Sequence, residues 1–146
     1  MNQPNNVNTE AILRTWLTIW GGMLMSCVMF ALMAWFIGQP TQLAGGESFI
    51  PLFPVLLMLA LGTLAASFVL KNKQLAQAIA EQKPLILQSG YILAWALCEA
   101  AALFGLVGIF VTKAAAFFSL IALGAVGLAL HFPKRDDLRA TTFKKL

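Results

Sequence analysis

Long apolar runs separated by short polar stretches form the pattern of this chain. Four apolar segments can be drawn, at residues 11–37, 49–70, 85–111 and 114–130. A helix needs about 20 apolar residues to cross a hydrocarbon core, whereas a spanning β-strand needs about half as many and alternates polar with apolar positions. These segments do not alternate. The pattern therefore predicts an all-α integral membrane four-helix bundle, with residues 1–146 forming a single transmembrane domain.

The polar stretches refine this prediction. Residues 71–84, "KNKQLAQAIAEQKP", contain few turn formers before Pro84, so we expect them to extend the second helix. Little more than Thr112 and Lys113 separates the third and fourth segments, which predicts a tight antiparallel hairpin. Residues 133–146 form a short basic tail, expected to lie along the membrane surface. The polar start lacks the Lys/Arg-rich beginning of a secretory signal, so the first segment is expected to remain as an anchor.

The basic residues favour one orientation. Four crossings put both termini on the same side, and that side then carries nine of the ten basic residues: Arg14, Lys71, Lys73, Lys83, Lys134, Arg135, Arg139, Lys144 and Lys145. The opposite side carries Lys113. Because Lys and Arg accumulate on the cytoplasmic side of membrane proteins, we expect both termini in the cytoplasm. The expected location is a bacterial-type inner membrane.

Composition supports the membrane assignment and argues against several function classes. Hydrophobic residues make up 60% of the chain and charged residues 11%, against roughly 45–50% and 25% in soluble domains. The net charge of +4 comes from residues beside the ends of apolar segments, where lipid headgroups lie, and no nucleic-acid-binding motif accompanies it. Cys27 and Cys98 lie in apolar segments without a CxxC or Cys/His pattern, so neither a metal site nor a cofactor is expected.

Small residues at four-residue spacing predict close helix packing, because backbone approach matters more than apolar burial within lipid. The third segment carries the largest set, at Gly90, Ala94, Cys98 and Ala102, with Ala101 and Gly105 in a neighbouring row. Shorter sets occur in the second segment, at Gly62 and Ala66, and in the fourth, at Ala115, Ser119, Gly124 and Gly127. Trp16 and Trp20 share one helical face, which we expect at the membrane boundary.

Glu99 is the candidate functional residue. It lies near the centre of the third apolar segment, close to the middle of the bilayer, where an ionised carboxylate is unfavourable by on the order of 3 kcal/mol or more. We therefore expect Glu99 to face protein. Polar partners are scarce: Thr63 and Ser67 on the second segment, Ser119 on the fourth, and Thr18 and Ser26 on the first.

Two interpretations of Glu99 remain open. In the first, the carboxyl group is a neutral hydrogen-bond donor that holds the third helix to a neighbour. In the second, it binds and releases a proton, as intramembrane acids do in transport proteins. No Lys or Arg within the spans can pair with it, and the one histidine, His131, is expected at the far, inner end of the fourth segment.

The stretch "ALCEAAALFGLVGIFV", from Ala96 to Val111, resembles the carboxylate-bearing helix of the proteolipid, or c, subunits of rotary ATP synthases. In that family a Glu or Asp is followed by small residues, an aromatic residue and Gly-Leu-Val. The resemblance implies that Glu99 is a proton carrier. This chain departs from the family in the second segment, which carries a single glycine, Gly62, and in the preceding loop, which lacks the family's arginine.

These features favour a non-enzymatic protein. The chain carries no HExxH, phosphate-binding glycine loop or nucleophile elbow. We therefore expect a structural or accessory subunit of a membrane assembly, in contact with lipid and associated with itself or a larger membrane complex. The alternative is a proton-binding, proteolipid-like subunit or small transporter component that uses Glu99.

Overall fold

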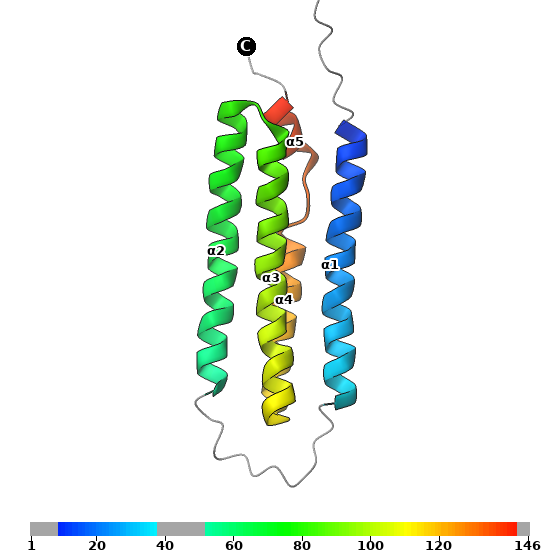
Figure 1. The fold of residues 1–146 in the computed structure, drawn as a ribbon, viewed down its shortest axis with the longest axis vertical. Coiled ribbons are helices and arrows are strands. Elements are labelled where there is room, and N and C mark those ends of the chain that lie inside the picture. Colours follow the sequence, from blue (N-terminus) through cyan, green and yellow to red (C-terminus); the bar gives the residue numbers. More distant parts are fainter. Residues whose placement is uncertain (1–8, 38–51, 143–146) are drawn as a thin grey trace, which may run out of the picture.

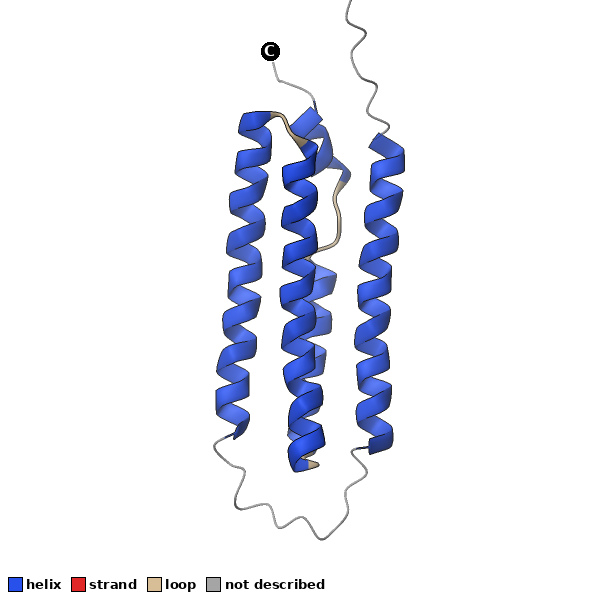
Figure 2. Cartoon of the chain, viewed as in Figure 1, coloured by secondary structure: helices blue, strands red, loops and turns tan. Residues whose placement is uncertain are grey.

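The computed structural model describes residues 9–37 and 52–142, and every secondary-structure element in these ranges is helical (Figure 2). The elements are α1 (Thr9–Ile37), α2 (Leu52–Glu81), α3 (Pro84–Thr112), the short 3₁₀-helix η1 (Ala115–Phe117), α4 (Phe118–Leu130) and α5 (Arg135–Thr142). Residues 1–8, 38–51 and 143–146 lie outside the described ranges, and with them the expected outer loop and the first residues of the second predicted helix.

The three long helices lie side by side, and α3 occupies the centre. Figure 1 shows α3 between α2 and α1, with α4 behind it, and α3 packs against all three. Among the described residues, α1 from Glu10, α2 and α3 are each long and apolar enough to cross a membrane. The predictions for the first and third helices agree with α1 and α3 to within about two residues, and α2 continues through residues 71–81 as expected.

The fourth segment is helical over nearly the predicted residues, because η1 and α4 together cover residues 115–130 against the predicted 114–130, but it does not qualify as a crossing by itself. The chain first forms η1, and α4 then has 13 residues, too few for a crossing on its own. Only if the bent pair of residues 115–130 and 135–141, with an angle of 52° between its parts, counts as one span does the described chain contain four. Apolar length therefore predicts where this helix lies, but not whether it crosses a membrane by itself.

Two tryptophan side chains hydrogen-bond to carbonyl oxygens at the C-terminal end of α4. Proline at 133 disfavours helical geometry at Phe132, which ends the helix. The indole nitrogen of Trp20 donates to the carbonyl oxygen of Leu128 and that of Trp95 to the carbonyl oxygen of His131, both over 2.9 Å. The last carbonyls of a helix lack partners within it, and an unpaired carbonyl is costly within lipid. The two tryptophans therefore allow a helix to end inside the bundle.

The C-terminal tail forms α5, which packs against α2 and α3 at one end of the bundle. Leu138 and Thr141 are fully buried there. The Tyr91 hydroxyl donates to a carboxylate oxygen of Asp137 over 2.5 Å, and the Lys71 ammonium lies 3.9 Å from the same oxygen. The first part of the tail therefore has a fixed place against the other helices, and its expected position along the membrane surface stays a prediction.

We expect Tyr91→Phe to loosen α5. The change removes the donor to Asp137, which is worth about 1–3 kcal/mol when the acceptor is charged. Hydrogen exchange of the α5 amides in detergent micelles should accelerate about tenfold or more, while exchange in α3 stays unchanged. Glu10→Gln is the matched control, because it breaks the ion pair of Glu10 with Arg135, in which both side chains are well exposed. Equal exchange in the two variants would contradict the assigned role of Tyr91.

The predicted small-residue rows on the third helix lie at packed interfaces. Gly90, Ala94, Cys98 and Ala102 are all buried, as are Ala101 and Gly105. In contrast, Gly62 of α2 is exposed, and a Cβ added there would meet nothing within 4 Å. Close packing is therefore concentrated on the helix that has neighbours on several sides.

The aromatic pair predicted for the membrane boundary is enclosed by protein. Trp16 is 1% exposed, and its ring centroid lies 5.2 Å from that of Tyr91. Trp20 is partly buried, and its ring packs edge-on against Phe132 at 5.1 Å. Trp20 therefore packs beside the non-helical residues that follow α4, and Trp16 packs on α3.

Candidate functional site

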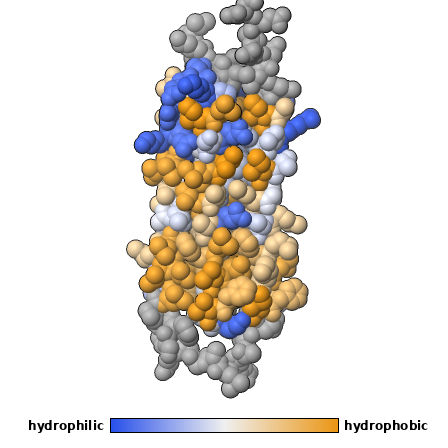
Figure 3. Space-filling view, viewed as in Figure 1, coloured by the Kyte–Doolittle hydropathy of each residue, from blue (hydrophilic) through white to orange (hydrophobic). Residues whose placement is uncertain are grey.

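Glu99 lies deep in an apolar belt. Figure 3 shows apolar side chains around the body of the molecule and most hydrophilic ones near the end that carries α5. At that end Lys71 lies over the Tyr91 ring, 4.5 Å from its centroid. From Tyr91 to the end of α3 at Thr112 is about 30 Å at 1.5 Å per residue, the thickness of a hydrocarbon core. Glu99, eight residues after Tyr91, lies about 12 Å further along the α3 axis than Tyr91.

The carboxyl group of Glu99 is hydrogen-bonded to Ser26 of α1. The Ser26 hydroxyl lies within donor distance of both the Glu99 Oε1 atom and the Met23 carbonyl oxygen, the latter at 2.8 Å. A hydroxyl carries one proton, so it cannot donate fully to both acceptors. A neutral carboxyl group resolves this conflict, because Glu99 then donates to Ser26 and Ser26 donates to Met23.

This polar pair is only partly enclosed. Glu99 and Ser26 are both of intermediate burial, and they lie at the contact between α1 and α3. The side chains next along the same helix faces are exposed and apolar, with Met29 50% exposed and Leu103 40% exposed. The pair is thus a polar spot at the edge of an exposed apolar surface.

Three of the hydroxyl groups predicted as partners of Glu99 instead donate hydrogen bonds to carbonyl oxygens of their own helices. Thr63 donates to the Ala60 carbonyl oxygen over 3.0 Å, and Ser67 donates to that of Leu64 over 2.6 Å. Ser119 is exposed and donates to that of Ala116 over 2.6 Å. Thr18, on the first helix, bonds to the Arg14 carbonyl oxygen in the same way, over 3.0 Å. Of the candidates in the sequence, the structure brings Ser26 to Glu99.

A second polar cluster surrounds His131, which the sequence analysis placed at the inner end of the fourth segment. The His131 side chain is fully buried at the C-terminal end of α4. Its Nδ1 atom lies 2.8 Å from the Gly127 carbonyl oxygen and 3.9 Å from the Cys98 sulfur, and its Nε2 atom lies 3.4 Å from the Ser67 hydroxyl oxygen. One feature of the sequence indicated that His131 lies at a helix end: Pro133 follows two residues later, and a helix usually ends before a proline.

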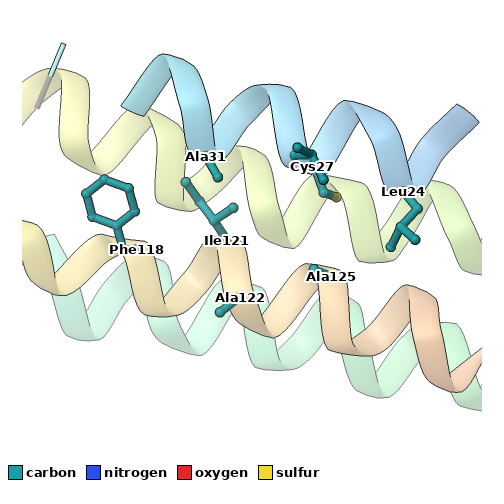
Figure 4. Close-up of a pocket in the computed structure, with 8 residues that line it drawn as sticks. Leu24, Cys27, Ala31, Phe118, Ile121, Ala122 and Ala125 are labelled. Atoms are coloured by element: carbon teal, nitrogen blue, oxygen red, sulfur yellow. The ribbon is translucent and has the colours of Figure 1, made fainter. Parts of the chain in front are cut away.

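An apolar groove runs between α1 and α4 (Figure 4). It has a volume of about 370 Å³ and is lined by Leu24, Cys27, Val28, Ala31, Phe118, Ile121, Ala122 and Ala125. Figure 4 shows the labelled lining residues on the two neighbouring helices, with Leu24 and Cys27 of α1 directed toward α4. The wall offers contact to apolar groups and carries no charged or hydroxyl group.

The described residues contain no group of three or more His, Cys, Asp or Glu side chains that could hold a metal ion. Cys27 and Cys98 are buried free thiols. Both act as small packing residues, and a Cβ added at Gly127 would lie 2.9 Å from the Cys98 sulfur.

Comparison of the chain with models of protein families, with characterised proteins and with solved structures finds no match. A functional proposal must therefore rest on the residues and their geometry.

Proposed function

We propose that this chain is a small multi-pass membrane subunit without enzymatic activity, which associates with itself or with a larger membrane complex. The single observation that carries the proposal is the partly exposed Glu99–Ser26 pair within an apolar, lipid-facing surface. Polar groups facing lipid are unfavourable, and hydrogen bonds across helices are a main force in membrane helix association. A neighbouring protein surface over this pair removes it from lipid.

The proposed topology has both termini on the cytoplasmic side of a bacterial-type inner membrane. The start of α1 and the whole of α5 lie at the same end of the bundle (Figure 1), as four crossings require. That end carries the described basic residues except Lys113, which follows α3 at the other end. The excess of Lys and Arg supports placing that end in the cytoplasm. In this arrangement α4, the segment 131–134 and α5 together form the fourth passage.

Self-association in liposomes tests the proposal. Copies of the full chain labelled with donor and acceptor dyes at the C-terminus should show energy transfer that depends on protein density in the membrane. Glu99→Leu should weaken association about fivefold, the effect of roughly one interhelical hydrogen bond. Ser119→Ala is the matched control, since that exposed hydroxyl bonds only to its own helix in this structure and its loss should change nothing.

Failure has a clear form. The proposal is contradicted if the wild-type chain stays monomeric at all densities and also fails to cross-link to another membrane protein in native membranes. The cross-linking test uses a photo-reactive residue introduced in place of exposed Met29. An association that Glu99→Leu leaves unchanged contradicts the role of Glu99.

A second candidate function is proton binding at Glu99. The observation that favours it is the single Ser26 proton shared between two acceptors, which a neutral, proton-loaded carboxyl group resolves. Glu99→Gln separates the two functions, because glutamine keeps a hydrogen-bonding group and cannot ionise. Retained association with lost proton flux across liposomes supports proton binding. Equal flux in wild-type and variant liposomes rules it out.

A further inference from the structure

We propose that His131 is a reversible proton-binding site in the interior of the bundle, separate from Glu99. The proposal rests on the hydrogen bonds around its ring and requires no association of the chain. His131 directly follows α4, so its ring lies where the chain leaves that helix and enters the non-helical link to α5. The ligand is a proton from water, which forms one N–H bond and converts imidazole to imidazolium.

The first step concerns the tautomer of the neutral ring. The Nδ1 atom lies 2.8 Å from the carbonyl oxygen of Gly127, which can only accept, so Nδ1 carries a proton and donates it. In the neutral imidazole the other nitrogen, Nε2, then has a bare lone pair. Nε2 is the atom that can take up a further proton.

The second step concerns what Nε2 faces. The nearest polar atom is the Ser67 hydroxyl oxygen at 3.4 Å, but Ser67 already donates its proton to the Leu64 carbonyl oxygen over 2.6 Å. The Cys98 thiol also points its proton toward Ser67, over 3.7 Å. In the neutral state two lone pairs therefore face each other across the contact between His131 and Ser67. Both side chains are fully buried, so this mismatch is unfavourable.

Protonation removes the mismatch. An imidazolium Nε2–H donates to Ser67, Ser67 donates to Leu64, and the chain of hydrogen bonds is complete from the α4 end into the backbone of α2. The ring of Phe68 lies beside the imidazole, with 4.3 Å between centroids, and an aromatic face attracts a cation. The consequence is that a proton on His131 ties α2 to the end of α4.

The charged and titratable groups around His131 act in both directions. Removal of the ring from water opposes the imidazolium most, and on α2 the positive charge of Lys71, one helical turn after Ser67, opposes it as well. On the C-terminal side, Asp137 pairs with Lys71 and offsets part of that charge. On α3, the Cys98 thiol lies beside the ring, and the Tyr91 hydroxyl lies one helical turn before Trp95. On α1, the buried titratable group is the Cys27 thiol. The balance of these groups sets the pH at which the site fills.

The chain has one histidine, so the test is specific. Full-length protein labelled with ¹⁵N-histidine in liposomes gives one pair of imidazole signals, whose positions report the tautomer and the charge. At high pH we expect the neutral Nδ1–H form. As the pH falls through the range of about 8 to 5, in which imidazoles ordinarily titrate, the imidazolium signal should replace it reversibly. A ring that stays neutral throughout, or that holds its proton on Nε2, overturns the proposal.

Two variants that keep His131 test the mechanism. Ser67→Ala removes the acceptor of the Nε2 proton, so the ratio of imidazolium to neutral ring at a fixed pH should fall about tenfold. Lys71→Gln removes an opposing positive charge, so the same ratio should rise roughly threefold or more. Thr63→Ala, one turn before Ser67 on α2, is the matched control and should leave the ratio unchanged. Titration unaffected by Ser67→Ala overturns the assigned hydrogen-bond chain.

Discussion

Replacing Gly124 by alanine should destabilise the bundle by about 1–3 kcal/mol, the range for adding volume to a packed interior. A Cβ at this position of α4 would lie 2.6 Å from the carbonyl oxygen of Cys98 and 2.7 Å from the backbone nitrogen of Ala102. Both atoms belong to the backbone of α3, so a side-chain rotation cannot make room. The two helices must separate, and every contact along their interface weakens.

Gly62→Ala provides the matched control for this prediction. Gly62 is also helical and lies in a long apolar helix, α2, but an added Cβ there meets nothing within 4 Å. Alanine also favours helix more than glycine does, so this variant should be as stable as the wild type or slightly more so. Unfolding of the purified protein by added SDS in mixed micelles measures both. Equal stability of the two variants would show that α3 and α4 do not touch as closely as described.

The long helices could be predicted because the bilayer leaves few alternatives. Apolar runs of sufficient length must form helices within lipid, where backbone groups have no water to bond. Pro84 marks the start of α3, and Lys113, in a left-handed conformation with φ 57°, ends it just before the turn into η1. Local residues determine these features, so a single sequence was enough to place them.

The end of α4 at Leu130 agrees with the predicted end of the fourth apolar segment, but the groups that stabilise it could not be predicted, because they are distant in the sequence. Trp20 and Trp95 are 108 and 36 residues away from the carbonyl groups that they cap. Without those donors, the carbonyl groups at a buried helix end have fewer partners, which is unfavourable. Pro133 indicated that a helix ends nearby. The sequence did not show which donors bond to the last carbonyl groups of that helix.

The partner of Glu99 depends on which helix faces which side of α3. Cys98 and Glu99 are consecutive residues, about 100° apart on the helix, so they face different neighbours. The structure turns Cys98 toward Ser67 of α2, which leaves Glu99 to Ser26 of α1. The sequence supplied all of the hydroxyl candidates, but helix order around α3 decided among them, and that order is a property of the packed bundle.

Trp95→Phe tests the capping of α4 with the smallest change in shape. The indole nitrogen donates to the His131 carbonyl oxygen over 2.9 Å, and Trp95 is fully buried. Phenylalanine keeps an aromatic ring but leaves this carbonyl without its donor. Because the acceptor stays buried, the loss should be about 1–3 kcal/mol in addition to the effect of the smaller ring.

Trp16→Phe separates these two contributions. Trp16 is as buried as Trp95, at 1% exposed, yet its indole nitrogen has no hydrogen-bond partner in this structure. The same substitution there removes the same volume and also removes an unpaired buried donor, so it should cost less than Trp95→Phe by at least about 1 kcal/mol. SDS-induced unfolding again gives the two values. If Trp16→Phe proves as destabilising as Trp95→Phe, ring volume alone explains both, and the half-length helix must be held by something other than its indole cap.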